Sequence, residues 1–391
     1  MGYKDLLINN KIVRDLSIIQ FVAYFGAWFS NVAIYSLLVK LNATSFIISI
    51  VVAMNFIPAI VLTPISGSLV DRLPLKSFML ILLGLELLMT LGFLTISSLD
   101  DIICLLVLLF IKMGSASIFF TTEMSLLPKL LKGDDLVKAN ELHSMIWSFT
   151  FTAGMALGGV VVDQFGIYSA FFIDAGFFFI ALIVLFNTNI QINTTKQTQH
   201  LLQDIKDGWI YLKSQKRILY MIFLHSSIGI TAFDTLITLL ADYNYKYIIS
   251  VPLAIGITNA IRALALMIGP FFITNWVNDK RLFYLFIIQG LAILLWAVLQ
   301  YNFYLALIGI FFTGFTTTTL WSYTYAMLQK EVNHKYIGRV LSYNEMAFMS
   351  SNILTTLFIG VAASFISLST ITVILAILFL IVAYYYKGVF L

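Results

Sequence analysis

The sequence predicts an all-α integral membrane protein with twelve transmembrane helices in two pseudo-symmetric six-helix bundles. Its composition is 60% hydrophobic and 11% charged, with a mean hydropathy of +0.96, whereas soluble domains are about half apolar and about a quarter charged. The apolar runs reach about twenty residues, the length of a helical span rather than of a barrel strand. The longest polar stretch, between Asn187 and Lys216, leaves six such runs on either side.

Each apolar run is long enough to cross a bilayer as a helix. We expect the spans at residues 16–38, 45–70, 77–97, 102–126, 137–162, 167–187, 217–240, 251–276, 282–300, 303–327, 338–363 and 368–386. The expected organisation is an N-terminal six-helix bundle over residues 1–187, a cytoplasmic linker over 188–216 and a C-terminal six-helix bundle over 217–391.

The linker carries an amphipathic pattern. Its apolar residues recur at helical spacing, on the face opposite its polar residues. The apolar residues are Leu201, Leu202, Ile205, Trp209 and Leu212. Such a helix lies either in the membrane interface or under the bundle. The pattern leaves both arrangements open.

The basic residues predict the orientation of the spans. Of the 23 Lys and Arg residues, nineteen fall on one side of the predicted spans, Lys40 and Lys246 fall on the other, and Lys112 and Arg262 lie inside spans. Because cytoplasmic loops are enriched in Lys and Arg, we expect both termini in the cytoplasm, in a multi-pass protein of the cell (inner) membrane. The single cysteine, Cys104, excludes an internal disulfide and a cysteine-rich metal site.

The connection between the second and third spans is short and charged. It reads Gly67-Ser-Leu-Val-Asp71-Arg72-Leu-Pro74-Leu-Lys76. A glycine near a helix end permits close helix packing, and the Asp-Arg pair with a later Lys makes a tight polar turn. Taken alone, this turn is either a hinge that borders water or an ordinary solvated loop.

Five of the ionisable residues inside the predicted spans are candidates for a cavity or for ion coupling: Glu86, Lys112, Asp234, Arg262 and Glu345. An ionisable group at membrane depth costs at least a few kcal/mol, so it is a functional hypothesis by default. Asp234 and Arg262 are placed to form an ion pair between neighbouring helices, with either a structural or a coupling role. Glu345 is either an interface residue, paired with Arg339 or Lys335, or a proton carrier.

Other polar and aromatic residues have less specific interpretations. Glu123, Glu141 and His143 are expected at the cytoplasmic ends as interface charges, and His225 as a hydrogen-bonded packing residue. Four aromatic residues are candidates for lining a cavity, although aromatic stripes on helices are more often packing: Phe119, Phe120, Trp147 and Trp321.

The fifth span contains a group of small residues. Gly154 and Gly158 have small-xxx-small spacing, and Gly159 follows directly. Such spacing lets helix backbones approach closely. We therefore expect these glycines to be helix-packing residues.

Together these features resemble the major facilitator superfamily. The resemblance rests on the two six-helix halves, the cytoplasmic linker and the pattern Gly67-x-x-x-Asp71-Arg72-x-x-x-Lys76, where the loop of the superfamily reads Gly-x-x-x-Asp-Arg-x-x-x-Arg/Lys. Four further stretches are similar to the branch that holds macrolide-efflux and enterobactin-exporter proteins: 125–142, 173–175, 207–212 and 336–342.

The resemblance implies alternating access around a midplane cavity, gated on the cytoplasmic side by the loop between helices two and three. In that gate Asp71 would accept hydrogen bonds, while Arg72 and Lys76 would steady the turn. Two features depart from the superfamily pattern: the fifth span lacks the Gly-Pro of many exporters, and the second copy of the loop is degraded at 275–281.

The resemblance also gives roles to two buried charges. Drug exporters of the superfamily commonly have Arg in the middle of helix four, where this chain has Lys112. Lys112 would then be a cavity residue that meets an anionic substrate group or influences a proton site; the alternative is a salt bridge to Glu86. Asp174 matches an Ile-Asp pair typical of the branch, with an expected structural role.

We therefore expect a secondary active transporter and not an enzyme. It is expected to act as an antiporter that couples proton entry to the efflux of amphiphilic or hydrophobic drug-like molecules. The sequence lacks the phosphate-binding loop of ATPases and the common hydrolase motifs. The expected partners are a small-molecule substrate, protons and the lipid bilayer, with no nucleic acid, cofactor or metal, and we expect a monomer. The alternatives are an exporter or flippase of a siderophore-like or lysophospholipid-like metabolite, and a non-transporting membrane scaffold or receptor.

Overall fold

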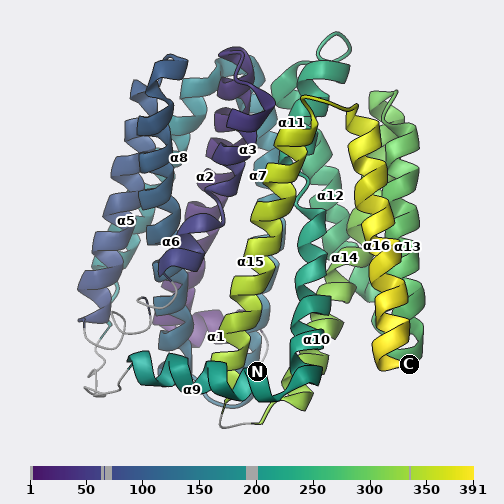
Figure 1. The fold of residues 1–391 in the computed structure, drawn as a ribbon. Coiled ribbons are helices and arrows are strands. Elements are labelled where there is room, and N and C mark those ends of the chain that lie inside the picture. The colour runs from purple at the N-terminus through teal and green to yellow at the C-terminus, as the bar shows by residue number, and fades with distance from the viewer. Residues whose placement is uncertain (1–2, 63–65, 67–72, 191–200, 334–335) are drawn as a thin grey trace. The chain divides into compact units, whose positions relative to one another are not determined.

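The computed structural model describes residues 3–62, 66, 73–190, 201–333 and 336–391 (Figure 1). All regular structure in these ranges is helical, and twelve segments are long and apolar enough to cross a membrane. The predicted all-α fold with twelve spans is confirmed. The helices extend beyond several of the expected apolar runs. The first, for example, begins at Lys11 and not near residue 16.

The described chain forms two compact units. Unit 1 contains residues 255–260 together with the helices α1 (Tyr3–Asn9), α2 (Lys11–Lys40), α5 (Leu75–Gly92), α6 (Ile102–Leu130), α7 (Asp134–Phe165) and α8 (Ile167–Asn187). Within this unit α2 packs on α7 and α8, and α5 packs on α6 and α8.

Unit 2 contains the remaining helices. They are α3 (Ser45–Ala53), α9 (Leu201–Ser214), α10 (Lys216–Ser226), α11 (Asp234–Leu240), most of α12 (Val251–Ile273), α13 (Asp279–Leu299), α14 (Phe303–Glu331), α15 (Ile337–Ala362) and α16 (Leu368–Phe390). The units cut across the predicted halves at α3 and at residues 255–260. The units are defined by packing, whereas the predicted domains are defined as continuous stretches of the chain. The predicted domain boundaries therefore stay a prediction.

Short polar side chains fix where several spans begin. Asn10 Oδ1 accepts a bond from the amide of Val13 at the start of α2, and Asn278 Oδ1 accepts one from the amide of Arg281 at the start of α13. Ser367 caps α16 in the same way. Such caps satisfy amides that have no partner within the helix. α2 and α13 therefore start at their caps, ahead of the apolar run, whereas the cap of α16 coincides with the edge of its run.

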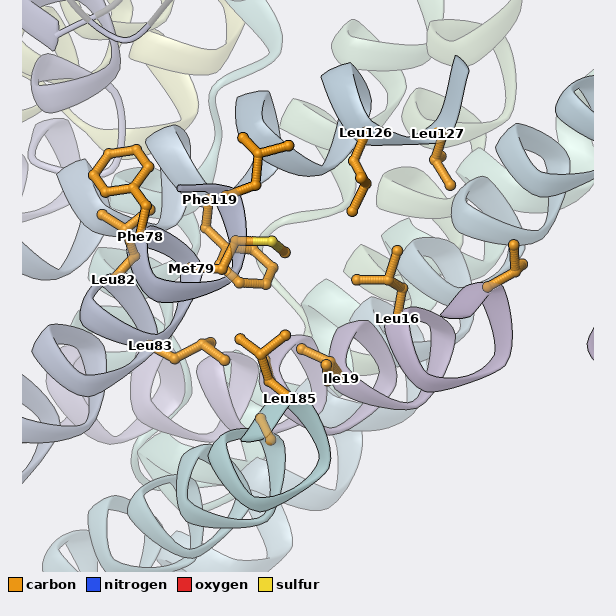
Figure 2. Packing of buried hydrophobic residues seen from close by; sticks show 14 of the residues in the cluster. Leu16, Ile19, Phe78, Met79, Leu82, Leu83, Phe119, Leu126, Leu127 and Leu185 are labelled. Carbon is orange, nitrogen blue, oxygen red and sulfur yellow. The ribbon is translucent and has the colours of Figure 1, made fainter. Parts of the chain in front are cut away.

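An apolar cluster fills part of the interior of unit 1 (Figure 2). Leu16 and Ile19 of α2 face Met79 and Leu83 of α5, and Leu185 of α8 joins them (Figure 2). All five side chains are almost completely buried. This packing holds the three helices that supply the polar residues described below.

The seventh span is interrupted, although the sequence predicts one continuous helix over 217–240. α10 ends at Ser226, a 3₁₀ turn covers Ser227–Thr231, and α11 starts at Asp234 and is followed by a π-helical turn, Ala241–Tyr245. At the break, a Cβ on Gly229 would lie 2.9 Å from the backbone nitrogen of Asn352. Glycine therefore allows α15 to approach the break closely.

The linker helix α9 packs on unit 2. Tyr211 stacks on Tyr336 with 4.2 Å between ring centroids, and Trp209 contacts the ring of Tyr343 on α15. Leu212 is buried against α10 and α15 residues. Of the two arrangements left open by the sequence, these contacts favour a helix packed on the protein.

Candidate functional site

A cavity of about 190 Å³ lies inside unit 1, between α2, α5, α6 and α7. Its wall includes the two ionisable residues that the sequence singles out in this half, Glu86 and Lys112. Both side chains are about 95% buried, with relative exposures of 5% and 4%. The cavity therefore combines membrane depth, enclosure and charge.

Lys112 is held by Asp174 of α8. Its Nζ lies 2.6 Å from Asp174 Oδ2, the same oxygen that accepts a hydrogen bond from the Ser30 hydroxyl. The rings of Phe93 and Phe178 lie 5.3 and 5.1 Å from the ammonium. These cation–π contacts and the short ion pair offset the desolvation of the charge.

Glu86 stands beside this pair on α5. The charge of Lys112 attracts its carboxylate and that of Asp174 repels it, but the ion pair of Lys112 is with Asp174 and not with Glu86. The alternative of a Lys112–Glu86 salt bridge is therefore wrong for this conformation. At this depth one cation, Lys112, serves two carboxyls. Because it pairs with Asp174, Glu86 lines the cavity without an ion-pair partner of its own among the described residues.

Aromatic residues form the opposite wall. Trp28 of α2 stacks on Phe151 of α7 with centroids 4.3 Å apart, and Trp147 meets both rings. The indole Nε1 of Trp28 is buried and has no acceptor among the described residues. Because buried donors are nearly always satisfied, this N–H is a donor available to a ligand.

The aromatic candidates from the sequence separate in the structure. Phe119 and Trp147 line the cavity. Phe120 does not line it; its ring packs beside His143 and is partly exposed. Trp321 belongs to unit 2, where it stacks on Tyr325 near His225.

Sequence reasoning missed a further buried carboxyl in unit 1. Glu123 of α6 is 1% exposed, and Gln20 Nε2 donates to its Oε1. The other oxygen, Oε2, has no partner among the described residues. The prediction of an interface charge at Glu123 is wrong, because the side chain is buried and bonded to Gln20 of α2. Glu141, in contrast, is exposed and accepts a hydrogen bond from the Tyr3 hydroxyl, which raises the pKa of Tyr3.

The glycines of α7 bring this helix against α2. A Cβ on Gly154 would lie 2.8 Å from the Cβ of Trp28, and one on Gly158 would lie 3.1 Å from the Cα of Phe29. A Cβ on Gly256 of α12 would lie 2.9 Å from the Cα of Gly159. The close approach at Gly154 positions Trp28 at the cavity wall.

Unit 2 holds a different polar cluster, at the break in the seventh span. Arg262 Nη2 donates to the carbonyl of Thr231 at 2.7 Å, and Nη1 lies 3.9 Å from Asp234 Oδ2. The guanidinium also lies 5.4 Å from the ring centre of Phe233. The Asp234–Arg262 pair expected from the sequence is thus present, but its stronger contact is with the backbone.

The remaining predicted residues are placed as follows. Gly67, Asp71 and Arg72 lie outside the described residues. Lys76 Nζ donates to the carbonyl of Phe186 near the end of α8, at 2.7 Å. Glu345 is half-buried on α15, and among the described residues no group of three His, Cys, Asp or Glu side chains could hold a metal ion.

Comparison with known proteins identifies a family. A family model described as Major Facilitator Superfamily matches residues 16–289. A curated relative, the uncharacterized MFS-type transporter YfiS of Bacillus subtilis (strain 168), is 29% identical over 222 residues, or 55% of this chain. The match spans about half of that relative, 52% of its length.

Solved structures share the fold at low sequence identity. The nucleoside transporter NupG is 16% identical with a TM-score of 0.77, and covers 100% of this chain and 99% of its own. A bacterial homologue of the iron transporter ferroportin is 14% identical with a TM-score of 0.72 over 97% of this chain and 99% of its own. A bacterial homologue of the lysosomal transporter Spinster is 12% identical with a TM-score of 0.74 over 97% and 96%. At these identities the likeness concerns the fold alone.

Proposed function

Because the chain belongs to the major facilitator superfamily and is therefore a membrane transporter and not an enzyme, we propose that it exports amphiphilic or hydrophobic drug-like molecules in exchange for protons. The proposed cycle is alternating access. The proposed location is the cell membrane, with both termini in the cytoplasm, which rests on the bias of Lys and Arg to one side.

The observation that carries the proposal is the cavity of unit 1. Its lining combines three aromatic residues, Trp28, Phe119 and Trp147, with two ionisable ones, Glu86 and Lys112. An apolar surface with a few polar groups is typical of sites for small organic ligands. The aromatic wall suits the apolar part of an amphiphile, and the free indole N–H of Trp28 suits a polar group on it.

The size of the cavity limits what it holds in this conformation. Its volume of about 190 Å³ is below the roughly 300–1,000 Å³ of pockets that enclose a drug-sized ligand. We propose that it is a subsite for one ring or one head group of the substrate. The rest of the molecule would lie outside the cavity.

Two buried carboxyls support proton coupling. Glu86 lines the cavity, and Glu123 has one oxygen without a partner among the described residues. A carboxyl at membrane depth is least costly when it is neutral, so its ionisation is expected to be tied to a state in which water or a cation reaches it. We propose Glu86 as the group that exchanges a proton for the substrate.

The loop over residues 67–76 is the proposed cytoplasmic gate. In this proposal Asp71 accepts hydrogen bonds, and Arg72 and Lys76 steady the turn. The bond from Lys76 to the end of α8 supports the last assignment. The same proposal leaves Asp234, Arg262 and Glu345 as candidates for coupling in unit 2.

Reconstituted flux tests the proposal. Purified protein in proteoliposomes is given a fluorescent aromatic cation or an uncharged aromatic amphiphile, with and without an imposed pH gradient. We expect the gradient to drive accumulation by the wild type, and we expect Glu86→Gln to retain downhill flux but lose the response to the gradient. Glu141→Gln removes an exposed carboxyl of the same unit and is the matched control. Gradient-driven accumulation by E86Q equal to that of the wild type would contradict the role of Glu86.

A second candidate is export or flipping of a lysophospholipid-like or siderophore-like metabolite. The observation that favours it is the presence of a cation and a carboxyl on one cavity wall, which suits a zwitterionic head group. A lysophosphatidylcholine arm in the same flux assay separates the candidates. Translocation of the lipid without flux of the aromatic compounds would favour the second.

A further inference from the structure

A long apolar groove runs along unit 2, apart from the cavity described above. It has a volume of about 500 Å³ and is formed by the end of α12, one face of α13 and the middle of α14. We propose that this groove binds one acyl chain of an anionic phospholipid, whose phosphate group is held by Lys280 and Arg281. This inference does not depend on the substrate of the transporter.

One stripe of α13 forms the floor of the groove. Leu285, Ile288, Ala292 and Leu295 line it, and they follow Arg281 at intervals of four, three, four and three residues, the spacing of a single helix face. From Arg281 to Leu295 the helix rises roughly 21 Å, at about 1.5 Å per residue. One leaflet contributes roughly 15 Å of the hydrocarbon core. The stripe is therefore long enough for an acyl chain.

Apart from the indole of Trp276 at one end, the groove has one polar lining residue among the described residues, Thr316 of α14. Its hydroxyl donates to Gln289 Oε1 in the interior of the unit. The small side chain of Ala292 leaves room between Ile288 and Leu295. An apolar chain can occupy such a groove without desolvating a donor or acceptor.

The charge lies at one end. Trp276 lines the groove, Arg281 Nη1 donates to its carbonyl at 3.0 Å, and the Arg281 guanidinium lies 5.5 Å from the Trp276 ring centre. Lys280 is adjacent and exposed. A tryptophan and basic residues at this position are typical of the level of the lipid head groups.

Neighbouring charges leave this end positive. The Asp279 carboxylate accepts a hydrogen bond from the Tyr323 hydroxyl at 2.6 Å, and its single negative charge is outnumbered by the positive charges of Lys280 and Arg281. Lys387 of α16 lies over the ring of Phe283, one turn from Asp279 on α13. Basic sites between transmembrane helices on the cytoplasmic side bind anionic head groups, and the charge count places Lys280 and Arg281 on that side.

The exposed residues beside the groove fit a lipid occupant. Ile288 and Leu295 are 43% and 41% exposed in the isolated chain, and both belong to a span that lies in a bilayer. In a membrane these surfaces meet acyl chains. The groove differs from the rest of this lipid-facing surface in two ways. It is a recess that can hold an acyl chain, and basic residues lie at one end of it.

Native mass spectrometry of the purified protein tests the proposal. Phosphatidylglycerol and phosphatidylcholine with identical chains are added at equal concentration, and bound lipid is counted. We expect the wild type to retain phosphatidylglycerol about tenfold or more over phosphatidylcholine, from the attraction of two basic residues. Lys280→Gln with Arg281→Gln is expected to abolish the preference, and Ile288→Trp is expected to reduce retention of both lipids by filling the groove.

The matched controls make the same kinds of substitution at exposed positions away from the groove. Lys129→Gln with Lys132→Gln makes the same change of charge on unit 1, and Val298→Trp adds the same side chain to an exposed position of α13 that does not line the groove. Both are expected to behave as the wild type. All of the substituted side chains are exposed, so folding is not at risk. Equal retention of the two lipids by the wild type, unchanged retention by I288W, or a second copy of the chain bound in place of lipid would overturn the proposal.

Discussion

The two units each bury a basic residue at membrane depth, but they satisfy it in different ways. In unit 1, Lys112 makes a 2.6 Å ion pair with Asp174, and both side chains are at most 5% exposed. In unit 2, Arg262 lies 3.9 Å from Asp234, with side-chain exposures of 12% and 22%, and bonds the Thr231 carbonyl at 2.7 Å. The first cation depends on a carboxylate, and the second mainly on the backbone.

This difference follows from the chemistry of the two side chains. An ammonium is a compact point charge that can lose its proton when buried, whereas a guanidinium stays charged and presents several donors in a fixed plane. Arg262 can therefore replace a missing helical hydrogen bond and contact a carboxylate at once. Lys112 can respond to a change at the cavity, and Arg262 is suited to hold the break in the seventh span open.

The largest effect is expected from Asp174→Asn, which leaves the Lys112 charge buried without its partner. Removing one member of a buried ion pair costs about 3–5 kcal/mol, so the thermal midpoint of the purified protein should fall steeply. The double variant Lys112→Gln with Asp174→Asn is the control, and should recover part of the loss. A double variant less stable than D174N would show that Lys112 does not depend on Asp174.

A smaller effect is expected from Arg262→Met. The substitution takes the donor from the Thr231 carbonyl, and an unsatisfied buried polar group costs about 1–3 kcal/mol. Thermal unfolding measures the loss, and hydrogen exchange at residues 227–234 locates it. Arg262→Lys keeps the charge but not the forked geometry. If R262K is as stable as the wild type, the bond to Thr231 needs only a cation.

Asp234→Asn should matter less than Arg262→Met. The ion pair is at the limit of contact and Asp234 is partly exposed, so a loss of about 1 kcal/mol or less is expected. The same measurement, run beside R262M, ranks the two contacts of Arg262. A larger loss from D234N than from R262M would reverse the order that the distances indicate.

The smallest effect concerns an exposed pair at the C-terminal end of the seventh span. Lys246 Nζ donates to Asp242 Oδ1 at 3.0 Å, and this bond raises the pKa of Lys246. A raised folded pKa means that the contribution to stability is complete below the unfolded value, about 10.4, and is lost as the pH rises through the folded pKa. NMR titration of ¹³C-methylated lysines measures the pKa of Lys246, and Asp242→Asn should bring this pKa down.

The sequence predicts the spans well because apolar runs of sufficient length leave few alternatives in a bilayer. The break in the seventh span could not be predicted in the same way. Gly229 does not signal the break, because glycine is tolerated in membrane helices. What interrupts the helix is Arg262, more than thirty residues later in the chain, and the close approach of α15 at Asn352.

The candidate site was predicted in part. Lys112 and Glu86 were found from their depth, and the structure places both at one cavity. The sequence named only Glu86 as an ion-pair partner of Lys112, and the structure pairs Lys112 with Asp174 instead. Which carboxyl meets the ammonium depends on how each helix is rotated, which the sequence does not show. Glu123 was missed because the hydropathy pattern does not show that Gln20 of α2 supplies a buried partner for its carboxyl.

Lys76 ties two distant parts of the chain together. It lies in the first turn of α5, where the charged loop ends, and its ammonium holds the carbonyl of Phe186, the penultimate residue of α8. The path along the chain between these two points is 110 residues long, but one hydrogen bond bridges it. Any rearrangement that pulls the start of α5 away from α8 must break this bond, so a spectroscopic probe at the end of α8 would report the state of the loop without touching it.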